Sequence, residues 1–264
     1  MIRIGLNGAA GRMGKRISSL IHNDANAQLC LALEHDNHHD LGKDIGLLIG
    51  EDPMGITLTS QFKNENLATI IDFSSPESSV KLAYLCAKNK IAFVTGTTGM
   101  SEAQLSEIRS LGSQIPILIG SNMSIGVNLL FKFAAQIAKA LGDEYDIEII
   151  EKHHRFKKDS PSGTALSIAQ SIADEIKRDL KEVGVYGRNG QTGERTQKEI
   201  GVHAVRAGDI VGEHTIIYGA LGETIELTHR AHTRDTFASG AVKAGKWLAG
   251  KKPRVYTMYD VLGL

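Results

Sequence analysis

The sequence predicts an α/β protein with a doubly wound sheet in one domain and an α+β arrangement with a mixed or antiparallel sheet in another. In the N-terminal part, short β-rich runs alternate with helical periods, a pattern typical of a parallel sheet covered by helices on both faces. After about Ser124, three strand-like runs follow one another with little helix between them. We therefore expect one domain at residues 1–124 and 235–264 and another at residues 125–234.

The first domain begins with the strand IRIGL (2–6), and a helix follows from Arg12 to about His22 with its apolar residues on one side. Another helix is expected after Ser74, because its hydroxyl can cap a helix and the carboxylate of Glu77 follows three residues later. A further helix begins at about Ser101. The remaining expected strands are residues 28–34, 68–73, 91–96 and 115–120.

The second domain is expected to begin with a long helix and to continue with a strand, a helix and a polar, glycine-rich loop. These segments are residues 125–141, 145–154, 164–180 and 187–197, in that order. Further strands are expected at 199–208, 213–220 and 223–231. A helix at 236–250 then precedes the segment 255–262, which is expected to return to the first domain.

Composition excludes several classes of function. Of the 264 residues, 42% are hydrophobic, and 30 basic residues balance 30 acidic ones, so no overall basic surface for nucleic acid is expected. No run approaches the ~20 apolar residues of a membrane span. The N-terminus enters a strand pattern at once and leaves no room for a signal peptide, so we expect a cytoplasmic protein. Cys30 and Cys86 lie in apolar runs, which favours reduced core thiols over a disulfide or a metal site.

A glycine turn joins the first strand to the first helix. Glycines stand at positions 8, 11 and 14, as G-x-x-G-x-x-G rather than the usual G-x-G-x-x-G. Glycines at such a turn let the backbone bend sharply and let a pyrophosphate approach the helix N-terminus. Glu34, at the end of the second strand, stands where a carboxylate would meet the ribose hydroxyls. A simple glycine-rich turn followed by an exposed glutamate is the alternative, but the complete order favours a Rossmann-type domain that binds NAD(H) or NADP(H).

Two later turns fall at the C-terminal ends of expected strands, where open α/β sheets bind ligands. They are Gly96-Thr97-Thr98-Gly99 and Gly120-Ser121-Asn122-Met123. Their hydroxyls and backbone groups could hydrogen-bond a nicotinamide amide. Taken singly, each turn is more often an ordinary loop.

The segment EKHHRFKKDSPSGTA (151–165) concentrates positive charge before a helix start. A helix N-terminus at Gly163 and Thr164 favours a carboxylate or phosphate, and Lys157 adds a full positive charge. His153 or His154 could supply a proton near neutral pH. Zinc is not expected, because no further Cys or His lies at ligand spacing. An ordinary charged loop with a good helix cap is the alternative interpretation.

These motifs together resemble the dihydrodipicolinate reductase family, whose signature reads roughly E-x-H-H-x-x-K-x-D-A-P-S-G-T-A. The matching segments are GAAGRMG, the position of Glu34, GTTG, SNMSIGVN and HHRFKKDSPSGTA, and they cover essentially the whole chain in the expected order. The resemblance implies reduction of 4-hydroxy-tetrahydrodipicolinate to tetrahydrodipicolinate by NADH or NADPH, with loss of water, in the diaminopimelate route to lysine. It also implies a homotetramer assembled through the second domain.

The resemblance assigns roles to individual residues. His153 would return a proton to the reduced ring, and Lys157 would be the second catalytic residue. The carboxylates of the cyclic substrate would be bound by His154, Gly163, Thr164 and Arg234. The cofactor would contact Gly8, Ala9, Ala10, Gly11, Arg12, Met13, Glu34, His35, Gly96, Thr97, Thr98, Gly120, Ser121, Asn122 and Met123.

Two positions depart from the family pattern. Ser160 replaces the usual alanine, a small change that should be tolerated. His35 stands where relatives that bind the NADPH 2′-phosphate well often carry arginine, and a largely neutral histidine attracts that phosphate less. Glu34 would repel the phosphate, although basic residues in the first helix would partly compensate. We therefore expect NADH to be used at least as well as NADPH.

Other functions fit the residues less well. An aldehyde dehydrogenase needs an accessible nucleophilic cysteine, and Cys30 and Cys86 are poorly placed for this. A sugar dehydrogenase has no reason for so cationic a pocket. A regulatory module that senses NAD(H) without chemistry would not need both His153 and Lys157 before an anion-binding helix.

Overall fold

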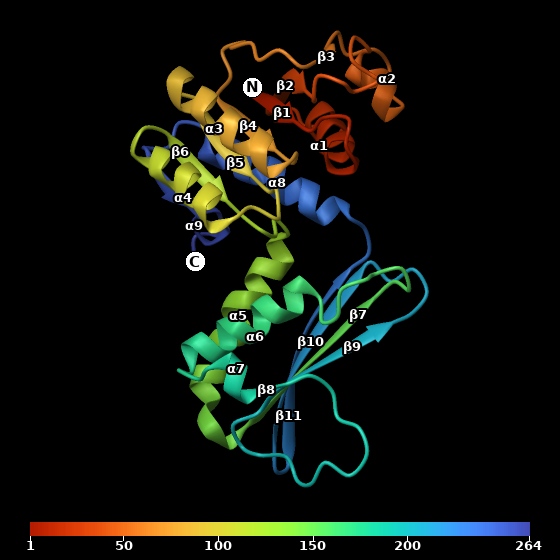
Figure 1. The fold of residues 1–264 in the computed structure, drawn as a ribbon, viewed down its shortest axis with the longest axis vertical. Helices are drawn as coiled ribbons and strands as arrows, with labels where there is room; N and C mark the ends of the chain where they lie inside the picture. The colour runs from red at the N-terminus through yellow and green to blue at the C-terminus, as the bar shows by residue number, and fades with distance from the viewer. The chain divides into compact units, whose positions relative to one another are not determined.

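The computed structural model describes residues 1–264 and divides the chain into two compact units (Figure 1). Unit 1 comprises residues 1–125 and 235–264, and unit 2 comprises residues 126–234. The predicted fold class is confirmed, because unit 1 holds a parallel sheet covered by helices and unit 2 holds a second, mixed sheet.

Unit 1 is built on a seven-stranded sheet in the order β12-β6-β5-β4-β1-β2-β3, in which every strand pair is parallel. β1 lies between β2 and β4. The chain runs from β1 through β2 to β3 at one edge, then returns to β4 and continues toward the other edge. The strand order therefore reverses beside β1, which creates a topological switch point at the carboxyl ends of the strands. The strands are β1 Ile2–Asn7, β2 Ala27–Leu33, β3 Leu58–Thr59, β4 Thr69–Asp72, β5 Ala92–Thr95, β6 Pro116–Ile119 and β12 Arg254–Tyr256.

Helices cover both faces of this sheet, and each face has its own hydrophobic core. On one face, α1 (Arg12–His22) packs beside α8 (Asp235–Leu248) over residues such as Ile4 and Leu6. On the other face, α3 (Pro76–Asn89) and α4 (Glu102–Ser110) bury Phe93 and Ile117. Side chains on both faces of each strand therefore pack against apolar residues, which explains the nearly continuous apolar runs in the sequence. Two short helices, α2 (Ile45–Ile49) and α9 (Met258–Leu262), complete the unit.

Unit 2 holds a five-stranded sheet in the order β11-β10-β7-β9-β8. β7 pairs antiparallel with β10 and parallel with β9, so the sheet is mixed. Figure 1 shows α5 (Ile125–Leu141) and α6 (Gly163–Glu175) on the same face of this sheet. The fully buried Tyr218 on β10 donates its hydroxyl to the Ala134 carbonyl of α5 at 2.6 Å. The strands are β7 Asp146–His153, β8 Gly184–Val185, β9 Ile200–Arg206, β10 Gly212–Ala220 and β11 Glu223–Ala231.

Two local expectations were wrong. The cap of α3 is Ser75 rather than Ser74, because the Ser74 hydroxyl bonds the Asp72 carboxylate instead. The helix expected at 164–180 ends at Glu175, because Lys177 adopts a left-handed φ of 57° that interrupts it. A separate short helix, α7 (Leu180–Val183), follows with the side chain of Asp179 as its cap.

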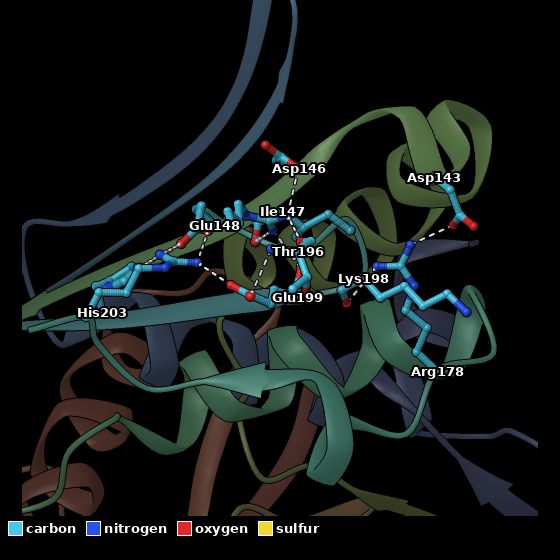
Figure 2. Close-up of polar contacts among 11 residues, drawn as sticks. Asp143, Asp146, Ile147, Glu148, Arg178, Thr196, Lys198, Glu199 and His203 are labelled. Atoms are coloured by element: carbon cyan, nitrogen blue, oxygen red, sulfur yellow. Dashed lines mark hydrogen bonds and ion pairs between the residues drawn. The ribbon is translucent and has the colours of Figure 1, made fainter. Parts of the chain in front are cut away.

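The glycine-rich segment 187–197 is tied to the sheet of unit 2 by charged side chains (Figure 2). Arg188 and Arg195 donate to the carboxylate of Glu148 on β7 at 2.8 and 2.9 Å. His203 Nε2 on β9 lies 2.6 Å from the same carboxylate. Burial of Glu148 alone raises its pKa, but these hydrogen bonds outweigh burial and lower the pKa from 4.5 to about 2.

One helical segment is long and apolar enough to cross a membrane by length and composition alone, contrary to the expectation from the sequence. It spans residues 125–144, with a mean hydropathy of 1.2. Core helices of soluble proteins pass the same test, and α5 buries Leu130, Phe131 and Ala134 inside unit 2. The segment is therefore weak evidence for a membrane span.

Candidate active site

The glycine turn of unit 1 has the geometry of a phosphate-binding loop. Gly8 adopts a φ of 75°, and a Cβ there would lie 2.2 Å from the Phe73 carbonyl oxygen. A Cβ at Gly14 would lie 2.1 Å from the Gly8 carbonyl oxygen, so α1 packs against the turn only because this residue is glycine. Gly11 caps α1 without a side-chain hydrogen bond, and the first turn of the helix carries no acidic residue. The helix N-terminus is therefore suited to an anion.

Glu34 lies beside this turn, directly after β2. Its Oε2 accepts a hydrogen bond from the Ala10 backbone nitrogen at 3.2 Å. Glu34 lines a pocket of about 320 Å³ together with Asn7 at the end of β1, Phe62 in the loop after β3 and Lys81 on α3. His35 is exposed and also lines the pocket. A carboxylate at the mouth of a pocket beside a phosphate loop fits the adenosine half of a dinucleotide.

Sequence analysis did not identify the buried carboxylate that organises this edge of the sheet, Asp72. Asp72 is fully buried at the end of β4 and accepts five side-chain hydrogen bonds. The hydroxyl of Thr97 donates to Asp72 at 2.8 Å and accepts from the Ser74 nitrogen at 2.9 Å, so this hydroxyl holds the loop together. The five donors are Asn7, Ser74, Ser79, Thr95 and Thr97.

The other predicted cofactor residues lie on the same edge of unit 1. Gly96 packs under the Phe73 ring, where a Cβ would come within 2.3 Å of it. The Gly120 nitrogen donates to the Thr95 carbonyl at 3.0 Å, and Asn122 Oδ1 accepts from the Ser124 nitrogen at 2.9 Å. The side chains differ in exposure: Ala9, Ala10 and Met123 are buried, Met13 is half-buried and Arg12 is exposed. Thr98 lies on the turn at 96–99, and Ser121 lies on the turn at 120–123.

In unit 2, the histidine predicted to be catalytic belongs to a buried ionic network. His153 is the last residue of β7, and its Nδ1 lies 2.5 Å from Oε2 of Glu151, whose side chain is 0% exposed. Arg206 on β9 donates to both oxygens of Glu151, at 2.8 and 2.7 Å. The ring of His214 on β10 meets the His153 ring edge-on, with centroids 5.2 Å apart.

The remaining predicted residues of this cluster flank His153. The Nδ1 atom of His154 is buried and has no hydrogen-bond partner. Lys157 is mostly buried and forms an ion pair of 2.9 Å with Asp159. Gly163 opens α6 in an exposed position with nothing within 4 Å of its missing Cβ, and Thr164 follows it. Arg234 is exposed at the end of unit 2, and no hydrogen bond joins it to this cluster.

Burial and charge act against each other on the titratable groups of this cluster. Burial lowers the pKa of His153, and the hydrogen bond with Glu151 raises it, with a net lowering. Burial raises the pKa of Glu151, but hydrogen bonds from Arg206, His153 and the Ser162 nitrogen produce a net lowering. Burial lowers the pKa of His214 to about 4, so this ring is neutral near pH 7. The lowered pKa of Glu151 keeps its carboxylate ionised beside the His153 ring.

Glu151, Arg206 and His214 were not singled out from the sequence. Glu151 stands in the signature segment, where alternation along a strand places it on the same face as His153. Arg206 lies 55 positions from Glu151, and only the parallel register of β7 with β9 brings the two together. His214 reaches the site through the antiparallel pairing of β7 with β10.

One further group has the spacing of metal ligands. The ligand atoms of His38, His39 and Asp40 lie within 4.8 Å of one another in the loop after β2. However, Lys43 Nζ lies 2.6 Å from Oδ1 of Asp40, and His38 Nδ1 accepts the Asp40 backbone N–H at 3.2 Å. These contacts favour a polar loop cluster over a cation site.

The parallel sheet, the phosphate loop and the carboxylate after β2 define a Rossmann-type oxidoreductase that uses a pyridine nucleotide. The chain belongs to the dihydrodipicolinate reductase family: its N-terminal family domain matches residues 2–123 and its C-terminal family domain matches residues 126–262. The resemblance inferred from the motifs is confirmed.

Relatives in this family match along their whole length. A relative from Syntrophus aciditrophicus named 4-hydroxy-tetrahydrodipicolinate reductase is 47% identical and covers 100% of this chain and 99% of its own. A relative of the same name from Pseudoalteromonas atlantica is 48% identical and covers 100% of both chains. The solved dipicolinate-bound dihydrodipicolinate reductase from Paenisporosarcina sp. TG-14 has a TM-score of 0.76 at 25% identity and covers 98% of both chains.

Proposed function

We propose that the protein reduces 4-hydroxy-tetrahydrodipicolinate to tetrahydrodipicolinate with NADH or NADPH, with loss of water, in the diaminopimelate route to lysine. Beyond family membership, the observation that carries the proposal is the position of His153. A buried histidine, held by a carboxylate, adjoins a helix N-terminus that is open to an anion. A ring that bears carboxylates and accepts a proton after reduction requires this combination.

The cofactor is held by unit 1 in this proposal. The turn from Gly8 to Met13 receives the pyrophosphate at the N-terminus of α1, and Glu34 receives the ribose hydroxyls. The carboxylate oxygens of Glu34 each accept one backbone hydrogen bond, from Ala10 and His35, and keep further lone pairs for the ribose hydroxyls. Bound NADH or NADPH supplies a hydride, and the turns at 96–98 and 120–123 hold the nicotinamide.

The substrate is held by unit 2 in this proposal. The backbone N–H groups at Gly163 and Thr164 bind carboxylate oxygens. His154 joins them once its ring turns, because its Nδ1 is buried and has no partner in this structure. Loss of the substrate hydroxyl as water leaves a ring C=C bond conjugated with the imine. Hydride addition to that C=C bond leaves an enamine, and His153 donates to the enamine carbon the proton that restores the imine. Lys157 leaves its ion pair with Asp159 to hold the developing charge or donate a proton. Arg234 is a secondary carboxylate ligand.

The protein is cytoplasmic and homotetrameric in this proposal. The pathway intermediates are small soluble dicarboxylates, so the enzyme needs no membrane. The sheet of unit 2 offers a surface for assembly, because β11 is an edge strand with most of its residues exposed.

Loss of NADH absorbance in the presence of freshly made 4-hydroxy-tetrahydrodipicolinate tests the activity. Turnover should depend on that substrate, whereas a stable NADH complex without turnover would support a sensor. His153→Gln should lower kcat by ~10²–10⁴-fold, the contribution of a general acid, without changing NADH affinity. His203→Gln is the matched control, because His203 is bound to Glu148 and not to the His153 cluster. If His153→Gln retained the turnover of that control, the assigned role of His153 would be wrong.

A further inference from the structure

Glu151 is a fully buried carboxylate, and all four of its hydrogen-bond donors belong to the cluster around His153. Oε2 faces His153 Nδ1 at 2.5 Å and receives Arg206 at 2.8 Å. Oε1 receives Arg206 at 2.7 Å and the Ser162 nitrogen at 2.9 Å. Removing a carboxylate from water costs several kcal/mol, and these four hydrogen bonds offset that cost.

We propose that Glu151 is a positioning residue that holds His153 with Nδ1–H toward the carboxylate and Nε2 toward the substrate. The inference rests on the proposed function, because it concerns the proton that His153 gives to the reduced ring. It adds a residue that does not touch the substrate and acts through the histidine.

The orientation of the ring follows from its two neighbours. Nδ1 faces Glu151, which as a carboxylate can only accept, so Nδ1 carries a hydrogen. On the other side, Nε2 lies beside Gly212 of β10, where even a Cβ would stand only 3.2 Å away. A glycine at this position leaves Nε2 uncovered. The free nitrogen is therefore the one that can reach a substrate atom.

The same carboxylate also sets the start of α6. Oε1 fixes the backbone of Ser162, and the Ser162 hydroxyl caps α6 by accepting from the Ala165 nitrogen at 3.2 Å. One side chain thus anchors both the proton donor and the anion-binding helix end. Because the hydrogen bonds of Glu151 with His153 and with the Ser162 nitrogen are both short, a shift of Glu151 would change the distance between the histidine and the bound carboxylates.

The charges that face His153 explain why the carboxylate does not take its proton. The charged groups that face His153 are Glu151 on its own strand, Arg206 on β9 and Lys157 in the following loop. The titratable ring of His214 on β10 also faces it. The two hydrogen bonds from Arg206 keep Glu151 ionised although it is buried. His214 is neutral near pH 7 and adds no charge. Glu151 therefore favours the imidazolium form of His153, whereas burial, Lys157 and Arg206 oppose it.

Glu151→Gln and Glu151→Asp test the inference by the pH dependence of kcat. Removing the charge of Glu151 lowers the pKa of His153 further, so the loss of activity with rising pH should begin at a lower pH in Glu151→Gln. We expect kcat to fall about 10- to 100-fold, as for other residues that orient a functional histidine. Glu151→Asp, which keeps the charge, should retain the wild-type pH profile. Glu213→Gln is the matched control, because Glu213 pairs with Lys152 and Arg230 and has no contact with His153. An unchanged pH profile in Glu151→Gln would overturn the inference.

A second measurement needs neither turnover nor a variant of Glu151. Nitrogen-15 NMR of histidine-labelled protein with NADH bound reports which ring nitrogen of His153 carries hydrogen, and His153→Gln identifies the signal. The inference requires hydrogen on Nδ1 in the neutral ring, and hydrogen on Nε2 alone would refute it. If the substrate were not reduced but Nδ1 carried the hydrogen, the proposed function would fail while the geometry of Glu151 would stand.

Discussion

Gly212→Ala should block the proton donor while leaving all of its own hydrogen bonds in place. The new Cβ would lie 3.2 Å from His153 Nε2 and 3.5 Å from its Cδ2. A proton donor must come within about 2.6–3.2 Å of its acceptor, so a methyl group this close to Nε2 would compete with the substrate for that nitrogen. The ring cannot easily retreat, because Glu151 holds Nδ1 at 2.5 Å.

The expected loss follows from what a displaced general acid costs. Full loss of such a group lowers the rate by ~10²–10⁴-fold, and a misplacement of about 1 Å already costs on the order of 10²-fold. We therefore expect kcat to fall about 10²-fold, which corresponds to ~2.7 kcal/mol in the activation free energy. NADH affinity should not change, because the residues proposed to bind the cofactor lie in unit 1.

The assay is NADH consumption at saturating substrate, with NADH binding followed by fluorescence and folding by the thermal midpoint. Gly219→Ala is the matched control, because Gly219 lies on the same strand and has nothing within 4 Å of its missing Cβ. A kcat for Gly212→Ala equal to that of Gly219→Ala, with both proteins folded, would show that Nε2 does not deliver the proton.

Three further predictions concern the cofactor and stability. Gly14→Val should weaken NADH binding in a fluorescence titration, because its Cβ would stand 2.1 Å from the Gly8 carbonyl oxygen and push α1 off the turn; unchanged affinity would contradict the assignment of this turn. NADH should support a kcat/KM at least equal to that of NADPH, because His35 attracts the 2′-phosphate of NADPH less than an arginine at this position would. A kcat/KM ratio strongly favouring NADPH would refute this. The pKa of Glu148 is lowered from 4.5 to about 2, so its contribution to folding is complete above 4.5 and is lost as pH falls toward 2. That contribution is on the order of 3 kcal/mol, and Glu148→Gln should show a smaller drop in urea stability over this range than wild type.

The elements best predicted from the sequence are those with strong local signals. The bounds of α1 were predicted correctly, because Gly11 and the apolar period of the helix mark them clearly. The strands β1, β2, β4, β5 and β6 of unit 1 were predicted to within one residue at each end, since burial on both faces makes them continuously apolar. The short elements α2, β3, α7, β8, β12 and α9 were missed, because segments of two to five residues are too short to show a period.

The parts of the site that were missed depend on pairing between distant strands. The bond between Arg206 and Glu151 requires the parallel alignment of β7 with β9. The Asp72 cluster likewise collects hydroxyls from separate loops that meet only when the parallel strands end together. An isolated sequence states which residues are polar, but register decides which polar groups meet.

The buried carboxylate of Asp72 has a consequence for how a nucleotide would be received. Because it binds side chains from the ends of β1 and β5 and from the start of α3, those loops are locked in place before any ligand arrives. A dinucleotide would then dock on a rigid rim and lose little affinity to ordering the protein. Asp72→Asn should therefore act chiefly as a loss of preorganisation, with slower capture and faster release of the nucleotide rather than a missing contact.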